Sequence, residues 1–178
     1  MLISSVLENN AIKLRALEPS DIELLYSWEN DTDNWLISST LVPFSRTILE
    51  QYIKNAHEDI YTAKQLRLIV VDKLRNNKIV GIIDLFDFDP LHGRVGVGIL
   101  IDPDERGKGF GFYALDLLKR YCFRILQVHQ LYANVLSENT VSIALFEKCG
   151  FIVAGLKREW VKTPHKWCDE LFLQCINK

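Results

Sequence analysis

A glycine-rich segment at residues 106–111 has the composition of an anion-binding loop. It reads Arg-Gly-Lys-Gly-Phe-Gly, follows an apolar run at 97–101 and precedes a segment with apolar residues at helical spacing, 112–122. Glycines allow the backbone to approach a ligand closely, and the first turn of a helix has N–H groups without intrahelical partners at its positive dipole end. Arg106 and Lys108 add positive charge. The order of strand, loop and helix therefore predicts a site for a phosphate-bearing ligand.

Two common nucleotide-binding motifs do not match this loop. A Walker motif needs Ser or Thr after Gly-Lys, whereas Gly109 follows Lys108 here. A dinucleotide-binding motif needs its third glycine three residues after the second, whereas Gly111 follows Gly109 by two. For the loop considered by itself, a turn that only connects a strand to a helix remains an equal alternative.

The composition predicts one globular domain, residues 1–178. Hydrophobic residues make up 48% and charged residues 25% of the chain, which is ordinary for a protein with a sizeable core. The net charge of −2 gives no basic field for nucleic acid. No apolar run is long enough to span a membrane, and residues 1–5 lack the features of a signal peptide. We therefore expect a cytoplasmic protein with neither nucleic acid nor membrane as a partner.

The chain has four cysteines and four histidines without the spacing of a metal site. Cys122, Cys149, Cys168 and Cys175 lie among apolar or helical residues and form no Cys-x-x-Cys pair. We expect them to be buried or free thiols, and we expect no metal ion.

The hydrophobic pattern predicts an α/β domain with a mixed central sheet of about six or seven strands flanked by about four helices. The predicted strands are 12–17, 65–71, 79–86, 97–101, 131–135, 151–156 and 170–176. The predicted helices are 22–28, 46–59, 112–122 and 137–148. Residues 29–44 are expected to be irregular, and residues 157–169 to form an exposed, tryptophan-containing hairpin that joins the last two strands.

A second motif accompanies the glycine loop at the expected distance. Residues 139–151 read Asn-x-x-Ser followed by Phe-x-x-x-Gly-Phe, one helix and one strand after Arg106. Together with Arg-x-x-Gly-x-Gly at 106–111, this resembles the GCN5-related N-acetyltransferases, the GNAT superfamily. Within it, the chain is most similar to spermidine N-acetyltransferases and next to ribosomal-protein N-terminal acetyltransferases. The resemblance covers nearly the whole chain and implies the GNAT fold.

The resemblance implies transfer of an acetyl group from acetyl-CoA directly to an amine, without an acyl-enzyme intermediate. Residues 106–111 would hold the pyrophosphate, the backbone at 99–101 would face the thioester and pantetheine, and Asn139 would contact the pantetheine arm. The cofactor-binding residues implied are Ile99, Leu100, Ile101, Arg106, Gly107, Lys108, Gly109, Phe110, Gly111, Asn139 and Phe146.

The chain departs from the family at the general acid. Spermidine acetyltransferases have a tyrosine where this chain has Phe146, which has no proton to give. The alternatives are Ser142, four residues earlier on the same face of the helix, Tyr113, or solvent. Of these, Ser142 also matches the serine of the ribosomal-protein group.

Acidic residues are the candidates for the amine side. Asp84 and Asp87 end a predicted strand where polyamine acetyltransferases have glutamates, and two carboxylates near one cleft would attract a polycation and raise each other's pKa. Solvated turn carboxylates are the alternative. Glu29, Asp31 and Asp33 form a vaguer acidic group, of which Glu29 and Asp31 are expected to contact the substrate. Trp28 and Trp35 could wall the substrate cleft, with core packing or a subunit contact as the alternative, and Trp35 is the one expected to contact the substrate.

We therefore predict an N-acetyltransferase acting on a small amine, with a polyamine as the first substrate to test. One alternative acceptor is a protein N-terminus, and a second alternative is a non-catalytic acyl-CoA-binding sensor, favoured by Phe146. The resemblance also implies a homo-oligomer, because the C-terminal hairpin often joins subunits in this family, and Trp160 and Trp167 there are compatible with such a contact.

Overall fold

The computed structural model describes residues 6–38 and 40–178, so the expectation for residues 1–5 lies outside it. Within the described chain, α-helices and strands follow in this order: β1 (Ile12–Ala16), α1 (Ile22–Glu29), α2 (Thr32–Ser38), α3 (Arg46–Asn55), α4 (Ile60–Ala63), β2 (Leu66–Asp72), β3 (Lys78–Asp89), β4 (Arg94–Ile101), α5 (Phe110–Arg124), β5 (Gln130–Leu136), α6 (Thr140–Lys148), β6 (Ile152–Lys162) and β7 (Trp167–Ile176). Short 3₁₀ turns occupy Pro19–Asp21 and Pro103–Glu105. The predicted α/β class is confirmed.

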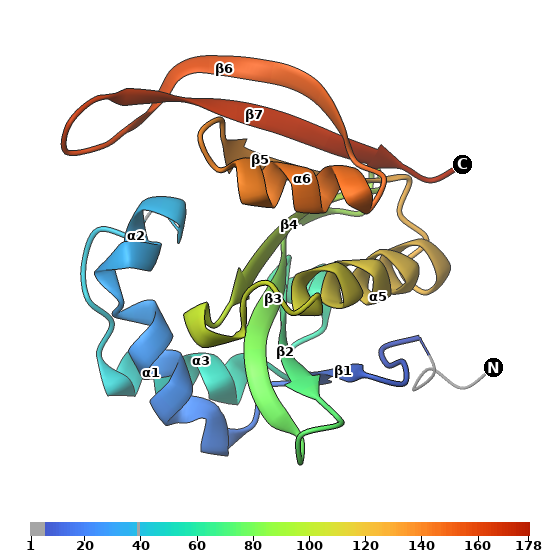
Figure 1. The fold of residues 1–178 in the computed structure, drawn as a ribbon. Helices are drawn as coiled ribbons and strands as arrows, with labels where there is room; N and C mark the ends of the chain where they lie inside the picture. The colour runs from blue at the N-terminus through green and yellow to red at the C-terminus, as the bar shows by residue number, and fades with distance from the viewer. Residues whose placement is uncertain (1–5, 39) are drawn as a thin grey trace.

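The strands of the described chain form one seven-stranded sheet with the order β1-β2-β3-β4-β5-β7-β6 (Figure 1). β1 to β4 are antiparallel neighbours. β4 and β5 are parallel, with α5 as the crossover helix between them, and β5, β7 and β6 are again antiparallel. The mixed sheet predicted from the sequence is therefore confirmed.

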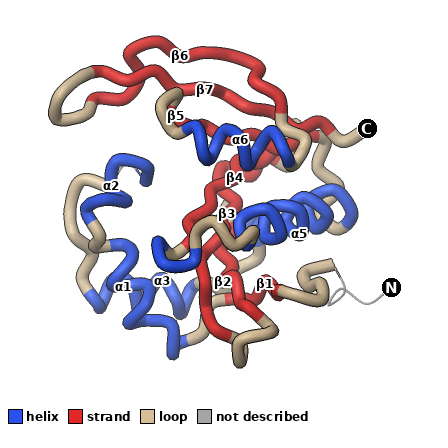
Figure 2. The backbone as a smooth tube through the Cα atoms, viewed as in Figure 1, coloured by secondary structure: helices blue, strands red, loops and turns tan. Residues whose placement is uncertain are grey.

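The sheet is covered on both faces, which explains why β2 contains an uninterrupted apolar run. Leu68 and Val70 belong to the larger core, to which α5 also contributes. Ile69 and Val71 belong to a second core together with Trp28 of α1. Because side chains alternate along a strand, a strand buried on both faces has few polar positions. Figure 2 shows α5 on one side of β3 and α1 on the other.

The N-terminal half contains more helix than the sequence predicts. Residues 29–44 are not irregular throughout, because α2 forms at Thr32–Ser38 and the carboxylate of Asp31 accepts a hydrogen bond from the backbone N–H of Asp33 in its first turn. The helix predicted at 46–59 ends at Asn55. Asp59 then starts α4 by accepting hydrogen bonds from two backbone N–H groups of its first turn. These two short helices raise the number from about four to six within the described residues.

The C-terminal hairpin is longer than predicted. Residues 157–169 form a hairpin, as predicted, but its strands are continuous with β6 and β7: pairing continues to Lys162 opposite Trp167, and the tight turn is at 163–166. The hairpin forms an arm along the top of Figure 1. Trp160 and Trp167 are 61% and 56% exposed on it.

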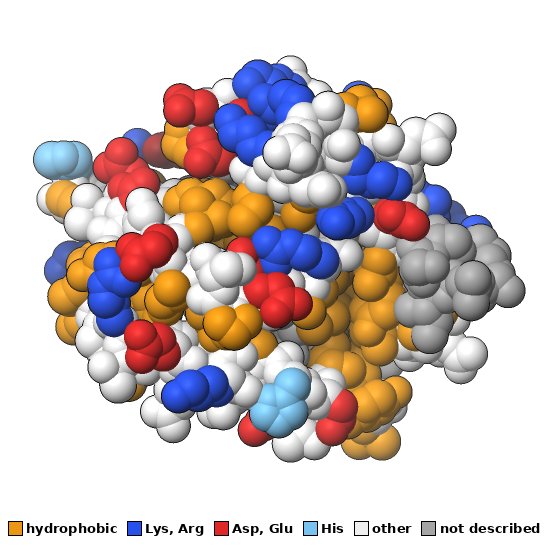
Figure 3. Space-filling model, turned by 90° about the horizontal axis from the view of Figure 1, so that it is seen from below, with side chains coloured by type: hydrophobic (Ala, Val, Ile, Leu, Met, Phe, Trp, Pro, Cys, Tyr) orange, Lys and Arg blue, Asp and Glu red, His pale blue; other side chains and the backbone are white. Residues whose placement is uncertain are grey.

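Charged side chains of both signs are interspersed with apolar ones on the face shown in Figure 3. The four cysteines are buried free thiols, as predicted. Among the residues that the structure describes, no helix is long and apolar enough to cross a membrane.

Candidate active site

The sheet opens where β4 and β5 part. The two strands pair from Arg94 opposite Gln130 to Gly96 opposite Tyr132. Over the rest of its described length β4 pairs with β3 alone. A cavity of about 480 Å³ lies at this opening and is lined by residues 97–100 of β4 and 134–136 of β5.

The cavity extends to both faces of the sheet. Leu100 packs with the core of the α1 face and Ile99 with the core of the α5 face, and both line the cavity. Two further groups of residues line the cavity. On the α1 face they include Glu29, Arg67, Asp84 and Phe86, and on the α6 side they include Asn139, Ser142 and Phe146. One cavity therefore joins an acidic group to the start of a helix.

An ion-paired cluster forms the wall on the α1 face. Arg67 lies directly opposite Asp84 across β2 and β3. Its Nε and Nη2 atoms donate hydrogen bonds to the Asp84 carboxylate at 2.7 and 3.0 Å, and its Nη1 pairs with Glu29. Its guanidinium also lies 5.5 Å from the centre of the Tyr52 ring. Burial alone lowers the pKa of Arg67, but the Asp84 carboxylate outweighs burial and raises it, so Arg67 stays charged.

Only one of the two aspartates predicted for the amine side lines the cavity. Asp84 lies inside β3, which extends to Asp89 rather than ending at Phe86. Asp87 is exposed, has a φ of +49° and lies at the irregularity between Phe86 and Asp89. The expected pair of carboxylates at one cleft is therefore not formed. The two residues are three positions apart, so strand alternation alone directs them to opposite faces, and Asp87 is exposed at the irregularity after Phe86.

The other predicted substrate residues divide in the same way. Glu29 lines the cavity. Trp35 and Asp31 do not: the Trp35 indole donates a hydrogen bond to the backbone oxygen of Glu29 at 2.8 Å, and the Asp31 carboxylate caps α2. Trp28, which together with Trp35 could be expected to wall a cleft, does line the cavity. The lining residues that the sequence reasoning missed include Asn34, Ser38, Arg67, Phe86, Asn134 and Glu170. Arg67 had a signal in the sequence, since it is the one charged residue in the apolar stretch 66–71.

The start of α6 forms the opposite wall. The Asn139 side-chain oxygen accepts a hydrogen bond from the backbone N–H of Ser142 at 3.1 Å and so caps the helix. Ser142 and Phe146 are one turn apart and both line the cavity. The Phe146 ring packs edge-on against Phe151, with centroids 5.0 Å apart. Tyr113, the other predicted acid, is 40% exposed on α5 and does not line the cavity.

The glycine loop has the backbone conformation that its composition predicts. Gly107 and Gly109 have φ angles of +75° and +86°, and Gly109 is the N-cap of α5. At Gly111 an added Cβ would lie 3.1 Å from Leu145 of α6, so these two helices approach closely there. The Arg106 Nε donates to the backbone oxygen of Ile101 at 3.1 Å. An added Cβ at Gly107 would meet nothing within 4 Å, so the loop has open space above it for an anion.

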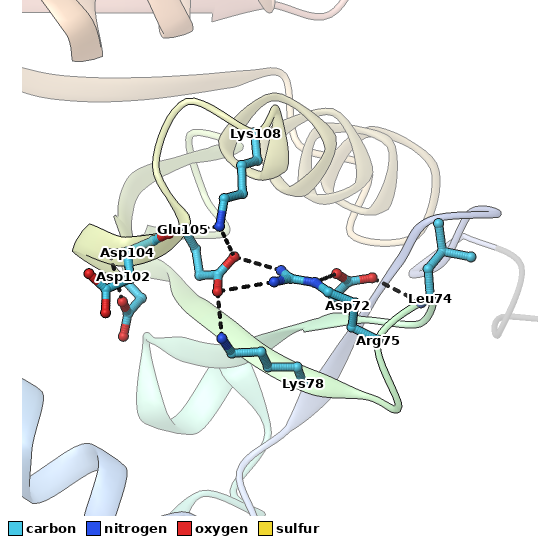
Figure 4. A network of polar contacts seen from close by, with 8 residues as sticks. All are labelled: Asp72, Leu74, Arg75, Lys78, Asp102, Asp104, Glu105 and Lys108. Carbon is cyan, nitrogen blue, oxygen red and sulfur yellow. Dashed lines mark hydrogen bonds and ion pairs between the residues drawn. The ribbon is translucent and has the colours of Figure 1, made fainter.

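A buried carboxylate lies directly before this loop. Glu105 is 2% exposed and receives ion pairs from Arg75, Lys78 and Lys108 (Figure 4). Hydrogen bonds from these three cations hold the pKa of Glu105 far below its usual range, against the opposing effect of burial. The sequence reasoning did not identify this cluster.

A family model described as an acetyltransferase (GNAT) domain matches residues 11–152. The chain therefore belongs to the GNAT acetyltransferase family, and it is an N-acetyltransferase whose co-substrate is acetyl-CoA.

The proteins most of whose length aligns with this chain include other N-acetyltransferases. Spermidine N(1)-acetyltransferase of Vibrio cholerae is 28% identical over 149 residues, covering 83% of this chain and 82% of the relative. An uncharacterized prophage-derived N-acetyltransferase of Bacillus subtilis, YokL, is 29% identical over 158 residues, covering 89% and 85%. The crystal structure of spermidine N-acetyltransferase from Vibrio cholerae in complex with CoA and spermine superposes with a TM-score of 0.84 at 26% identity, covering 94% of this chain and 96% of that one.

Proposed function

We propose that this N-acetyltransferase acetylates a primary amine of a polyamine such as spermidine. The observation that carries the proposal is the cavity through the split sheet, which has Glu29 and Asp84 at one end and the start of α6 at the other. Carboxylates attract a cationic amine. The likeness to spermidine acetyltransferases over most of the chain supports the same substrate class.

In this proposal the coenzyme lies along β4 and the glycine loop. The backbone N–H groups at the start of α5 and the Arg106 side chain would hold the diphosphate. The backbone of Ile99, Leu100 and Ile101 would face the thioester and pantetheine, with the Asn139 amide beside the pantetheine arm. Gly107, Lys108, Phe110 and Gly111 would complete the loop, and Phe146 would pack against the cofactor.

Acetyl-CoA supplies the activated acetyl group, and the chain's own residues would move two protons. The amine enters as an ammonium, and Asp84 takes its proton through a water molecule, while Arg67 holds the carboxylate in place. Backbone N–H groups of β4 stabilise the oxyanion that forms when the amine attacks. The attacking nitrogen still carries an extra proton, which would pass to solvent as the amide forms. The departing thiolate would take a proton from Ser142, which solvent replaces, or directly from solvent.

The deciding experiment measures release of free coenzyme A thiol from acetyl-CoA in the presence of spermidine, spermine, short diamines and N-terminal peptides, with a blank lacking acceptor. Turnover with polyamines above the blank is the expected result. Turnover with peptides alone would instead favour a protein N-terminal acetyltransferase, the second candidate, which is supported by Ser142 in the cavity. Tight coenzyme A binding without turnover for any acceptor would favour a non-catalytic sensor.

The proposal also includes a homo-oligomer that buries the exposed face of the β6–β7 hairpin around Trp160 and Trp167. Analytical ultracentrifugation of the purified chain tests this directly. A Trp160→Ser, Trp167→Ser variant should sediment as a smaller species, and an unchanged sedimentation coefficient would contradict this interface.

A further inference from the structure

Glu105 is a buried acid directly before the glycine loop that the proposed reaction does not use. Its side chain is 2% exposed, and it ends the 3₁₀ turn at Pro103–Glu105 that leads into Arg106. Its backbone N–H donates to the backbone oxygen of Asp102 at 2.9 Å, which fixes where the side chain starts. Burying a carboxylate costs free energy unless partners compensate its charge. Glu105 therefore requires its partners.

Two of the partners come from the hairpin between β2 and β3. Arg75 donates to the two oxygens of Glu105 at 3.2 and 2.6 Å, and Lys78 donates at 2.6 Å. Arg75 is itself held by the carboxylate of Asp72, which is 4% exposed. The hairpin is 27–30 residues away in the sequence, so Glu105 joins the loop to a distant part of the sheet.

The third partner belongs to the loop. The Lys108 ammonium donates to Glu105 at 3.0 Å and to the backbone oxygen of Asp104 at 2.8 Å. Figure 4 shows the Lys108 side chain directed back from the loop toward Glu105. On the other side of the loop, the Arg75 guanidinium lies 5.4 Å from the centre of the Phe110 ring, in the first turn of α5. The same cluster thus contacts the loop at two points, on either side of Gly109.

We propose that Glu105 is a positioning residue for the diphosphate loop. Glu105 binds Lys108 of the loop and, at the same time, Arg75 and Lys78 of the hairpin. These contacts would hold residues 107–110 in the conformation in which backbone N–H groups face the diphosphate. Lys108 would then act as a brace inside the protein, and its charge would not contact the phosphate. This inference rests on the proposed placement of the diphosphate but not on the identity of the amine.

If Lys108 contacts the phosphate instead, the coenzyme A affinity should change in the opposite direction when the Glu105 charge is removed. If Lys108 bound phosphate directly, Glu105 would compete for its ammonium, and removing the Glu105 charge would tighten coenzyme A binding. If Glu105 positions the loop, removing its charge loosens three contacts and weakens binding. The direction of the change therefore separates the two arrangements.

The experiment measures the Kd of coenzyme A and of dephospho-coenzyme A by calorimetry for the wild type, Glu105→Gln, Lys108→Met and the double variant. We expect each single variant to raise the Kd of both ligands by roughly tenfold or more, because small displacements of binding groups have effects of this size. The double variant should be little weaker than either single variant, because both remove the same contact. Equal losses for the two ligands would place the effect at the diphosphate rather than at the 3′-phosphate.

Asp21→Asn is the matched control. Asp21 is another buried carboxylate, 3% exposed, and its arginine partner is Arg15 on β1 rather than a residue of the loop cluster. This variant should lose stability but keep the wild-type Kd. If Glu105→Gln does not fold, Lys78→Met removes one contact from the exposed side and should weaken binding in the same direction.

An unchanged or tighter Kd for Glu105→Gln would overturn the inference, as would strictly additive losses in the double variant. Because binding is measured without an acceptor, wild-type binding without turnover would count against the proposed function and leave this inference standing.

Discussion

The guanidinium of Arg67 and the carboxylate of Asp84 face each other across neighbouring strands and share two hydrogen bonds, at 2.7 and 3.0 Å. Planar, two-bond pairing fixes the orientation of both groups. The Asp84 carboxylate is therefore held at the wall of the cavity in one direction, with Glu29 on the other side of the same arginine.

Asp84→Asn should lower kcat/KM for the amine by about 100-fold, because the amide cannot accept the proton and carries no charge. Coenzyme A affinity should stay within a few-fold of wild type. Asp87→Asn is the matched comparison, since Asp87 is exposed and outside the cavity, and it should change kcat/KM much less. Steady-state kinetics on both variants test this, and equal losses would contradict the assignment of Asp84.

Ser142→Ala should lower kcat by about tenfold, less than a typical general acid contributes, because a coenzyme A thiolate leaves with only partial help. Phe146→Tyr should restore kcat in the Ser142→Ala background. The Phe146 ring already lines the cavity, so a hydroxyl added to this ring would supply a proton donor there. Val141→Ala, 80% exposed on the same helix, is the control. If all three variants kept wild-type kcat, solvent would be the proton donor.

Arg106→Ala combined with Gly109→Ala should abolish coenzyme A binding in calorimetry. The first change removes a cation, and the second forces an L-residue to a φ of +86°, at a cost of about 1–2 kcal/mol. Gly150→Ala imposes similar strain at φ +90°, at the end of α6. It should reduce the melting temperature and leave binding intact, whereas retained binding in the double variant would rule out the loop as the diphosphate site.

Gly96→Ala should raise KM for the amine and lower the free energy of unfolding by about 1–3 kcal/mol. An added Cβ would lie 2.3 Å from the Phe86 ring, which lines the cavity and packs edge-on against Tyr132. The ring must therefore shift, and the cavity is the open space beside it. Gly155→Ala, where the added Cβ meets nothing within 4 Å, should leave both quantities unchanged.

Stability should fall as the pH drops below about 4, where carboxylates begin to protonate. The pKa values of Glu105 and Asp21 are lowered in the folded protein, for Glu105 by hydrogen bonds from its three cations and for Asp21 by Arg15 and the Glu18 N–H, which outweigh burial. A group with a lowered folded pKa stabilises the fold above its unfolded pKa and loses that contribution as the pH falls. Urea unfolding at several pH values should show that the free energy of unfolding falls less steeply with decreasing pH in Glu105→Gln than in wild type. Parallel curves for the two proteins would show that Glu105 does not cause the loss of stability.

The features that local spacing determines were predictable from the sequence. The glycine loop and the Asn-x-x-Ser motif at 139–142 both occupy helix starts, where a few consecutive residues decide the conformation. The mixed sheet followed from the order of apolar segments. From these features the sequence predicts the class of protein and the residues of α6 that line the cavity.

The missed features depend on contacts between distant residues. Arg67 meets Asp84 only because of the register between β2 and β3. Asp87, three positions further along β3, is exposed at the bulge after Phe86. Glu105 was missed because its partners lie on a hairpin about 30 residues earlier in the chain. The partners of Arg67 and of Glu105 cannot be read from a local spacing, because they lie on other strands or hairpins.

The divergence of β4 from β5 also determines where the sheet has unpaired strand edges. An open strand edge normally invites a strand from another chain, with aggregation as a common result. Here the open edges of β4 and β5 face each other across the cavity inside the sheet, rather than lying at its rim. These edges are flanked by the other strands of the same sheet, whereas a rim edge would be open to a strand of another molecule. The unpaired hydrogen-bonding groups of β4 and β5 thus face the protein's own cavity instead of forming an outer edge of the sheet.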